Sequence, residues 1–222
     1  MSIHAIIFGA TGMVGQAVLL ECLDSKDVGK VLLINRRPVS IKHEKLREVI
    51  HQDFSDFSTL IKEFSGYNAC YFCLGVSAVG LSEEEYTKTT YDLTISVAEA
   101  IKKTGVDFTF VYVSGKGTDS SEKGSMMWAR VKGRTENKLL SMHFKNAYMF
   151  RPGFIQSLKG IRSKTKAYNF FIAILNPFYF LLKHLKGVVT NTTSFGKAMI
   201  NITLNGYSKK IIENEDVNIL GS

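Results

Sequence analysis

Short apolar runs alternate along the chain with stretches in which apolar residues recur every three or four positions. The first run covers residues 3–8, and a helical pattern follows it, with Val14, Val18 and Leu23 on one face. Further strand-like runs follow at residues 31–37, 45–53, 69–77, 108–115 and 147–155, and the last one runs into a turn. Because such strands alternate with helical patterns, the sequence predicts an α/β fold, a doubly wound parallel sheet of the Rossmann type.

The helical patterns complete this picture. They cover residues 57–64, 90–104, 125–142 and 193–204, with a further helix start at Ser82 and a last edge strand at 209–213. Residues 167–189 are apolar but are interrupted by Pro177, which predicts two short helices, each below the ~20 apolar residues of a membrane span. We expect one domain over residues 1–222, in which residues 156–205 form a small, helical, substrate-side segment.

The turn after the first strand carries glycines at positions 9, 12 and 15. In a strand–turn–helix unit, Gly9 permits the tight turn, Gly12 lets the backbone approach a pyrophosphate, and Gly15 lets the helix pack closely on the strand. The helix start then presents free N–H groups and a positive dipole end to phosphates. A plain turn is the alternative, but the apolar strand before and the helix after favour dinucleotide binding.

The end of the second strand selects the cofactor in a fold of this kind. An Asp or Glu there would bind the ribose 2′-hydroxyl and repel a 2′-phosphate, whereas this chain has Asn35, Arg36 and Arg37. Guanidinium groups bind phosphate bidentately and keep their charge. We therefore expect NADP(H) rather than NAD(H). The alternative is that both arginines are ordinary solvated charges.

Three later strand ends add candidate positions. At Asp53 and Phe54, a carboxylate could accept from the adenine amino group while an aromatic ring covers the base. Asp53 could equally cap the next helix. The run at residues 69–77 suits a central strand covered on both faces, and its break at Leu74 and Gly75 would bring backbone close to the cofactor. Ser114 ends the fifth strand, where parallel sheets bind their ligands, so it is placed to contact a substrate.

Composition narrows the class of protein. The net charge is +8, but the basic residues are spread out, which disfavours nucleic acid as a partner, and a membrane-surface patch at residues 170–185 is a minority interpretation. Cys70 and Cys73 have the spacing of a redox pair, yet they lie in an apolar run and are better explained as buried side chains. The five histidines suggest no metal site. The sequence starts without a signal-peptide pattern, so we expect a cytoplasmic protein.

The glycine turn of residues 9–15, Ser114 at the end of the fifth strand and Lys132 in the following helix together resemble the atypical short-chain dehydrogenases/reductases. This superfamily includes NAD-dependent epimerase/dehydratase-like proteins, NmrA-like sensors and Tat-interacting-protein reductase-like proteins. The likeness extends to the Arg151-Pro152-Gly153 segment. It implies a serine that polarises the substrate carbonyl, a tyrosine that transfers the proton, and a lysine that holds the nicotinamide ribose and lowers the pKa of the tyrosine.

Ser114 and Lys132 match this catalytic set, but Trp128 stands four residues before Lys132, where the tyrosine is expected. An indole N–H only donates and is no acid–base group near neutral pH. The resemblance further implies cofactor contacts through the glycine turn, on the ribose side and at the nicotinamide end. The residues of the glycine turn are Thr11, Met13 and Val14, those on the ribose side are Leu74, Gly75 and Val76, and those at the nicotinamide end are Pro152, Gly153 and Ile155.

Two functions are compatible with these features. The first is an NADP(H)-dependent oxidoreductase or epimerase that acts on a small carbonyl or hydroxyl compound, with Ser114 and Lys132 as its catalytic residues. The second is a non-catalytic NADP(H)-binding sensor or partner-binding module, because Trp128 occupies the tyrosine position. A homodimer is a candidate assembly.

Overall fold

The first apolar run becomes an interior strand of a parallel sheet, between β2 and β4. The computed structural model describes residues 2–161, 187 and 189–222, and in this part of the chain the sheet has seven strands in the order β3-β2-β1-β4-β5-β6-β9. All neighbouring pairs are parallel, which confirms the predicted doubly wound sheet. Its strands are β1 (Ile3–Phe8), β2 (Val28–Asn35), β3 (Leu46–Ile50), β4 (Ala69–Phe72), β5 (Thr109–Val113), β6 (Asn146–Arg151) and β9 (Ile211–Glu213).

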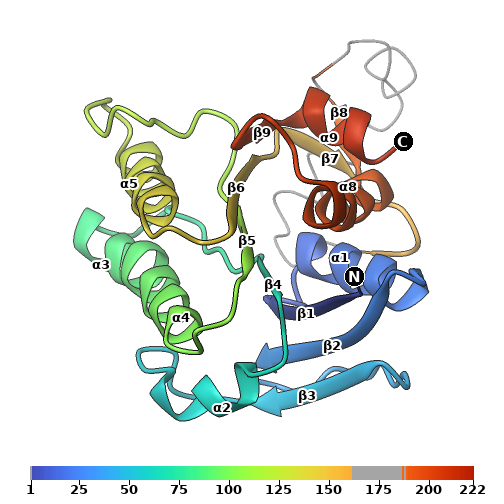
Figure 1. Cartoon of the computed structure of the whole chain (residues 1–222). Helices are drawn as coiled ribbons and strands as arrows, with labels where there is room; N and C mark the ends of the chain where they lie inside the picture. The colour runs from blue at the N-terminus through green and yellow to red at the C-terminus, as the bar shows by residue number, and fades with distance from the viewer. Residues whose placement is uncertain (1, 162–186, 188) are drawn as a thin grey trace.

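The helices cover both faces of this sheet. On one side lie α1 (Met13–Asp24), α8 (Thr192–Asn205) and α9 (Asn214–Leu220), and on the other lie α3 (Glu83–Thr87), α4 (Leu93–Lys102) and α5 (Met127–Ser141) (Figure 1). The 3₁₀ turn η1 (Ser58–Leu60) and α2 (Ile61–Phe64) pack with α4, and the π-helical segment η2 (Lys88–Asp92) joins α3 to α4. The strands β1, β2 and β3 follow one another toward one edge of the sheet, whereas β4, β5 and β6 follow one another toward the other edge. The strand order therefore reverses between β1 and β4, and a crevice forms outside the carboxyl ends of these two strands.

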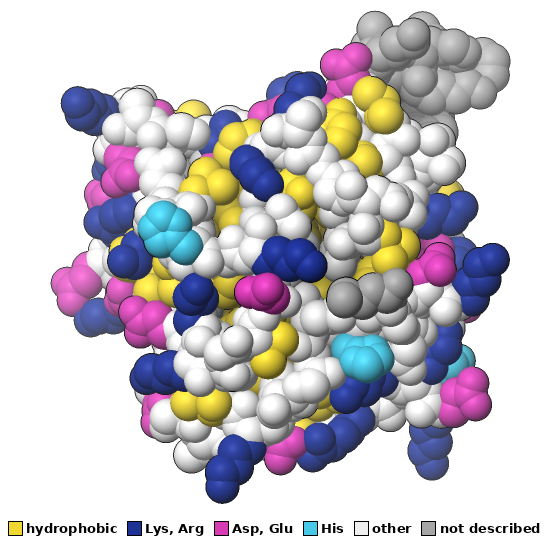
Figure 2. Space-filling model, in the orientation of Figure 1, with side chains coloured by type: hydrophobic (Ala, Val, Ile, Leu, Met, Phe, Trp, Pro, Cys, Tyr) yellow, Lys and Arg dark blue, Asp and Glu magenta, His cyan; other side chains and the backbone are white. Residues whose placement is uncertain are grey.

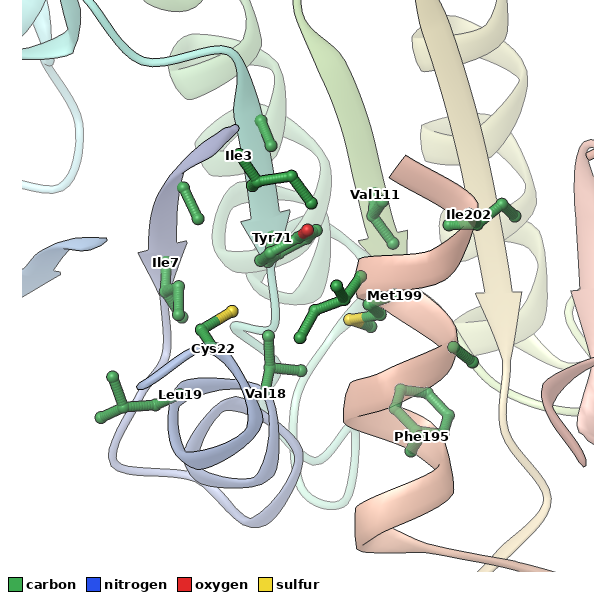
Figure 3. Close-up of a cluster of buried hydrophobic side chains, with 14 of the residues drawn as sticks. Ile3, Ile7, Val18, Leu19, Cys22, Tyr71, Val111, Phe195, Met199 and Ile202 are labelled. Atoms are coloured by element: carbon green, nitrogen blue, oxygen red, sulfur yellow. The ribbon is translucent and has the colours of Figure 1, made fainter. Parts of the chain in front are cut away.

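A dry core holds α1 and α8 against the sheet. Figure 3 shows Val18 and Cys22 of α1 facing Tyr71 of β4, with Phe195 and Met199 of α8 alongside. The two helices approach closely at Gly196, where an added Cβ would come within 3.0 Å of the Ala17 carbonyl oxygen. This packing fixes α1, and with it the glycine turn at the helix start.

Several predicted boundaries differ from the structure. The run at residues 147–155 is two strands, because Pro152 removes a donor and the chain bends after β6. The second strand, β7 (Phe154–Gln156), pairs with β8 (Val189–Asn191) in a separate small sheet. The helix expected from residue 90 begins in the π-helical segment, and α9 follows the edge strand β9, a helix that sequence analysis missed. The two short helices expected at 167–189 lie almost wholly outside the described residues.

The helix lengths and the surface charges bear on the partners expected from the sequence. In the described part of the chain, no helix is both long and apolar enough to cross a membrane. On the face in Figure 2, lysine and arginine side chains are interspersed with acidic ones.

Cys70 packs in the core on the α4 side, whereas Cys73 packs against the core on the α1 side. The two thiols therefore point to opposite faces of the sheet, which agrees with buried side chains rather than a redox pair.

Candidate functional site

The glycine turn has a backbone that other residues could not adopt easily. Gly9 has φ +83°, and a Cβ there would lie 2.7 Å from the Cys73 carbonyl oxygen. The Gly12 amide donates to the Gly9 carbonyl at 2.9 Å and closes the turn. A Cβ on Gly15 would overlap that same Gly9 carbonyl, so the helix can lie against the strand only with glycine here. Gly9 and Gly15 thus have the structural roles that the sequence pattern predicts for them.

The start of α1 is left without a protein cap. Gly12 is the N-cap residue and has no side chain that could accept from the first helical amides, and the first turn holds no acidic residue. Such amides, together with the positive end of the helix dipole, favour an anion. Thr11 is exposed, and Met13 and Val14 are half-buried at this helix start. The arrangement fits a pyrophosphate.

A cleft of about 490 Å³ lies beside this turn. It is bordered by β1, by the end of β2 and by the segments that follow β3 and β4. Its lining residues are Gly9, Thr11, Ile34, Asn35, Arg36, Arg37, Gln52, Phe54 and Leu74. The structure therefore brings together most of the residues predicted for the adenosine half of a dinucleotide. Gln52 is an addition that sequence analysis did not single out.

The two arginines at the end of β2 border this cleft and are exposed. Neither forms an ion pair with any residue that the structure describes. Asn35 is buried, and its side-chain amide donates to Glu48 Oε1 at 2.7 Å. The Glu48 carboxylate also accepts from the Val39 amide at 3.1 Å. Glu48 on β3 thus holds both ends of the turn that carries the two guanidinium groups.

The residues after β3 support the same turn. Gln52 Nε2 donates to the Arg36 carbonyl at 2.9 Å, and the Arg36 guanidinium lies 5.5 Å from the centre of the Phe54 ring. Asp53 is exposed and does not line the cleft. Its Oδ1 accepts from the Ser55 amide at 2.9 Å, and hydrogen bonds from Ser55 lower the pKa of the Asp53 carboxyl. The expected helix cap is wrong for Asp53, because Asp56 accepts from the Ser58 amide there.

The residues predicted for the other half of the cofactor follow β4 and β6. Leu74 is half-buried in the cleft wall, whereas Gly75 and Val76 are exposed in the loop beyond it. After β6, the Pro152 carbonyl accepts from the Lys116 amide at 2.9 Å, and the Gly153 amide donates to Asn214 Oδ1 at 3.0 Å. Ile155 is buried in β7, where it pairs with β8.

Ser114 is the largest departure from expectation. It is buried, and its hydroxyl donates to Glu136 Oε1 at 2.5 Å, with the Phe150 carbonyl oxygen 3.2 Å away. Glu136 is fully buried in α5 and forms an ion pair with Arg151 at the end of β6. The Arg151 Nε lies 3.1 and 3.2 Å from the two carboxylate oxygens. The serine proton is thus committed to the protein rather than open to a substrate, and Glu136 escaped sequence analysis.

Lys132 lies one turn before Glu136, and its Nζ donates a hydrogen bond to the Ser114 carbonyl oxygen. Burial lowers the pKa of the Lys132 amine to about 8, and the Glu136 carboxylate partly opposes this shift. Trp128 lies one turn earlier and is half-buried, and a Cβ on Gly117 would come within 3.4 Å of its ring. In the described part of the chain no three His, Cys, Asp or Glu side chains gather as a metal site would require.

The parallel sheet and the glycine cradle at its switch point define an NAD(P)-binding Rossmann protein of the epimerase/dehydratase type. The profile of the NAD dependent epimerase/dehydratase family matches residues 5–136, more than half of the chain, and the chain belongs to this family. The structure of MoeE5 in complex with UDP-glucose and NAD superposes with a TM-score of 0.67 at 16% identity, over 96% of this chain and 79% of that one. This structural likeness supports the fold.

Relatives with similar sequences come from fungi and mammals. Protein FMP52, mitochondrial, of Debaryomyces hansenii is 29% identical over 164 residues, which cover 73% of this chain and 70% of that protein. Protein HTATIP2 of Rattus norvegicus is 29% identical over 151 residues, which cover 67% of this chain. The match spans 61% of HTATIP2, less than two thirds of its length.

The expected cytoplasmic location is wrong by this comparison. FMP52 proteins of several fungi are named mitochondrial, and they are among the relatives that this chain matches. The expectation depended on a missing signal-peptide pattern at the start of the sequence, and that pattern reports on secretion rather than on organelles.

Proposed function

We propose that the chain binds NADP(H) in preference to NAD(H). One observation carries this proposal: Arg36 and Arg37 border the cleft beside the glycine cradle without carboxylate partners among the described residues, and the acid that would bind a ribose 2′-hydroxyl is replaced by Asn35. A charge-assisted hydrogen bond to phosphate contributes about 1.5–3 kcal/mol, enough for roughly a tenfold preference or more from each arginine.

The residues at the cleft fit such a cofactor. The uncapped α1 start would hold the pyrophosphate, and the Arg36 and Arg37 guanidinium groups would hold the 2′-phosphate. Phe54, already beneath the Arg36 guanidinium, would face the adenine. When bound, the nicotinamide supplies or accepts a hydride, and the protein orients it against a substrate.

Titration calorimetry with NADP⁺ and NAD⁺ tests the cofactor preference. Arg36→Ala and Arg37→Ala are each expected to weaken NADP⁺ binding about tenfold and to leave NAD⁺ binding almost unchanged. Arg47→Ala is the matched control, because Arg47 on β3 is exposed, forms an ion pair with Glu63 of α2, and does not line the cleft. Equal affinity for the two cofactors in the unaltered protein would refute the preference.

For activity, we propose an oxidoreductase or epimerase that acts on a small carbonyl or hydroxyl compound. Its site would lie at the carboxyl ends of β5 and β6, beside Lys132. A panel of aldehydes, ketones and alcohols, with NADPH or NADP⁺ followed by absorbance of the reduced nicotinamide, tests this proposal. Turnover that disappears in Lys132→Met would support it.

A second candidate function is an NADP(H) sensor without turnover. It is favoured by Trp128 in the place of a phenol and by the commitment of the Ser114 hydroxyl to Glu136. Tight NADPH binding, combined with no oxidation by any compound of the panel, would favour the sensor. In that case Trp128→Tyr is informative, because new reductase activity would show that the rest of the site is assembled.

A further inference from the structure

A reductase or dehydrogenase of this fold needs a group that gives or takes a proton, and the described side chains leave few candidates. Tyr86 and Tyr112 are buried, and burial raises the pKa of both phenols. Tyr91 lies under the Arg134 guanidinium, 4.9 Å from its ring centre. The Ser114 proton is held by Glu136, and Trp128 has no acid–base group in the neutral range.

Lys132 differs from all of these. Its amine lies at the carboxyl end of β5, the side of the sheet on which parallel folds bind ligands, and one N–H donates to the Ser114 carbonyl oxygen. A Cβ on Gly115 would be 3.9 Å from Nζ, so the amine lies against the start of the loop that follows β5. An ammonium has three donors, and no carboxylate of the described residues forms an ion pair with this one.

Burial, rather than any nearby charge, explains why the Lys132 amine loses a proton readily. Glu136 is one turn further along α5, and its carboxylate is already paired with Arg151 from β6. The exposed Lys116 follows Gly115 in the loop after β5, Asp119 lies further along that loop, and Glu213 on β9 pairs in register with Arg151. The Glu136 carboxylate favours the ammonium form of Lys132, but burial favours the neutral amine more strongly, so the pKa is lowered.

We propose that Lys132 is the proton carrier of this site, in the place of a phenol, and that Glu136 is the residue that positions it. This inference rests on the proposed cofactor binding. In the reducing direction the Lys132 ammonium gives one proton to the substrate oxygen, and the resulting neutral amine takes one proton back from water. In the oxidising direction the neutral amine accepts the hydroxyl proton and later releases it to water.

The same chemistry links cofactor binding to proton uptake. A phosphate-rich cofactor brings negative charge to the carboxyl ends of the strands, which stabilises the ammonium form of Lys132. At pH 8 about half of the amines are neutral, so binding of NADPH, whose nicotinamide ring is uncharged, is expected to take up as much as about half a proton. The uptake should shrink at about pH 6.5, where Lys132 is already charged.

Calorimetry of NADPH binding at pH 8, in Tris and in HEPES buffers of different ionisation enthalpy, measures this uptake. We expect a buffer-dependent heat in the unaltered protein and in Lys138→Met, the matched control on an exposed lysine of α5. We expect none in Lys132→Arg, which stays charged, or in Lys132→Met. In Glu136→Gln the pH of largest uptake should move down, because the carboxylate that supports the ammonium is lost.

The outcomes separate the two proposals. Saturable binding with the same heat in both buffers would overturn the role of Lys132 and leave cofactor binding intact, whereas no saturable binding would refute the proposed function itself. A second readout needs no cofactor: the ¹³Cε resonance of Lys132, assigned with Lys132→Met, should titrate near pH 8. Titration above about pH 10, the range of an ordinary lysine, would show a permanently charged side chain and overturn the inference.

Discussion

The Ser114 hydroxyl donates to the Glu136 carboxylate, 2.5 Å away, and this bond ties the end of β5 to the middle of α5. The same carboxylate holds Arg151, so a single buried acid joins β5, β6 and the helix that carries Lys132. Arg151 extends the network to the loop after β5, because its terminal nitrogen lies 2.5 Å from Ser120 Oγ. The serine is therefore part of the framework that positions the site.

This network makes a graded prediction for stability. Glu136→Ala leaves the Arg151 guanidinium largely buried without its partner and is expected to lower the free energy of unfolding by about 3–5 kcal/mol. Ser114→Ala removes one hydrogen bond to a charged group and is expected to cost about 1.5–3 kcal/mol. Urea unfolding followed by circular dichroism measures both. A smaller loss in Glu136→Ala than in Ser114→Ala would contradict the network.

The glycine turn offers a matched pair of substitutions. Gly9 and Gly80 have nearly equal φ values of +83° and +81°, but only at Gly9 would a new methyl group meet backbone, the Cys73 carbonyl at 2.7 Å. Gly9→Ala should therefore abolish NADP⁺ binding and destabilise the protein by more than the ~1 kcal/mol of backbone strain expected for Gly80→Ala. Equal effects of the two substitutions on stability would contradict the tight packing between β1 and β4.

The buried amine of Lys132 predicts a stability that depends on pH. Its folded-state pKa of about 8 lies below the unfolded value near 10.4, so between these two pH values the unfolded chain binds more protons and stability rises with pH. Lys132→Met should therefore be more stable than the unaltered protein at pH 7, by at most ~3 kcal/mol. Urea unfolding of both proteins at pH 7 and at about pH 10 measures this difference in stability, which should be smaller at the higher pH. A difference that grows with pH would contradict a lowered pKa of Lys132 in the folded protein.

The three thiols should be unreactive in the folded protein. Cys22 and Cys70 are buried, Cys73 lies at the edge of the core, and burial raises the pKa of each thiol. A chromogenic aromatic disulfide reagent in mildly alkaline buffer should label none of them in the native protein within minutes and all three in denaturant. Fast labelling of the native protein would show that the core on either face of β4 opens readily.

Local patterns were sufficient to predict the sheet. Residues 3–8 form a strand because an unbroken apolar run suits a strand buried on both faces, and Gly9, Gly12 and Gly15 determine the turn that leads into α1. The turn at the end of the sixth strand was predicted, but β7 was not, because Phe154 and Ile155 look like a continuation of the same apolar run beyond Pro152. The short α9 was missed because nothing in its pattern extends beyond two turns.

The site could be predicted only where it depends on backbone and neighbouring positions. Glu48 and Gln52 act across strands on the turn at Arg36, and Glu136 acts across β5 and β6, so their roles depend on tertiary contacts. One signal was present for Glu136. It lies one turn after Lys132 on α5, and an acid in that position faces the same strand ends. The hydrogen bond from Ser114 to Glu136 could not be predicted either, because a serine at a strand end can turn toward the core as well as toward a ligand.

The central claim is that the Arg36 and Arg37 guanidinium groups, beside the glycine cradle, select a cofactor with a 2′-phosphate. Titration calorimetry with NADP⁺ and NAD⁺, under identical salt conditions, tests it most directly. We predict NADP⁺ binding at least about tenfold tighter than NAD⁺ binding, and a ratio close to one in the Arg36→Ala, Arg37→Ala double variant. NAD⁺ binding as tight as NADP⁺ binding in the unaltered protein, or no binding of either cofactor, would contradict the account.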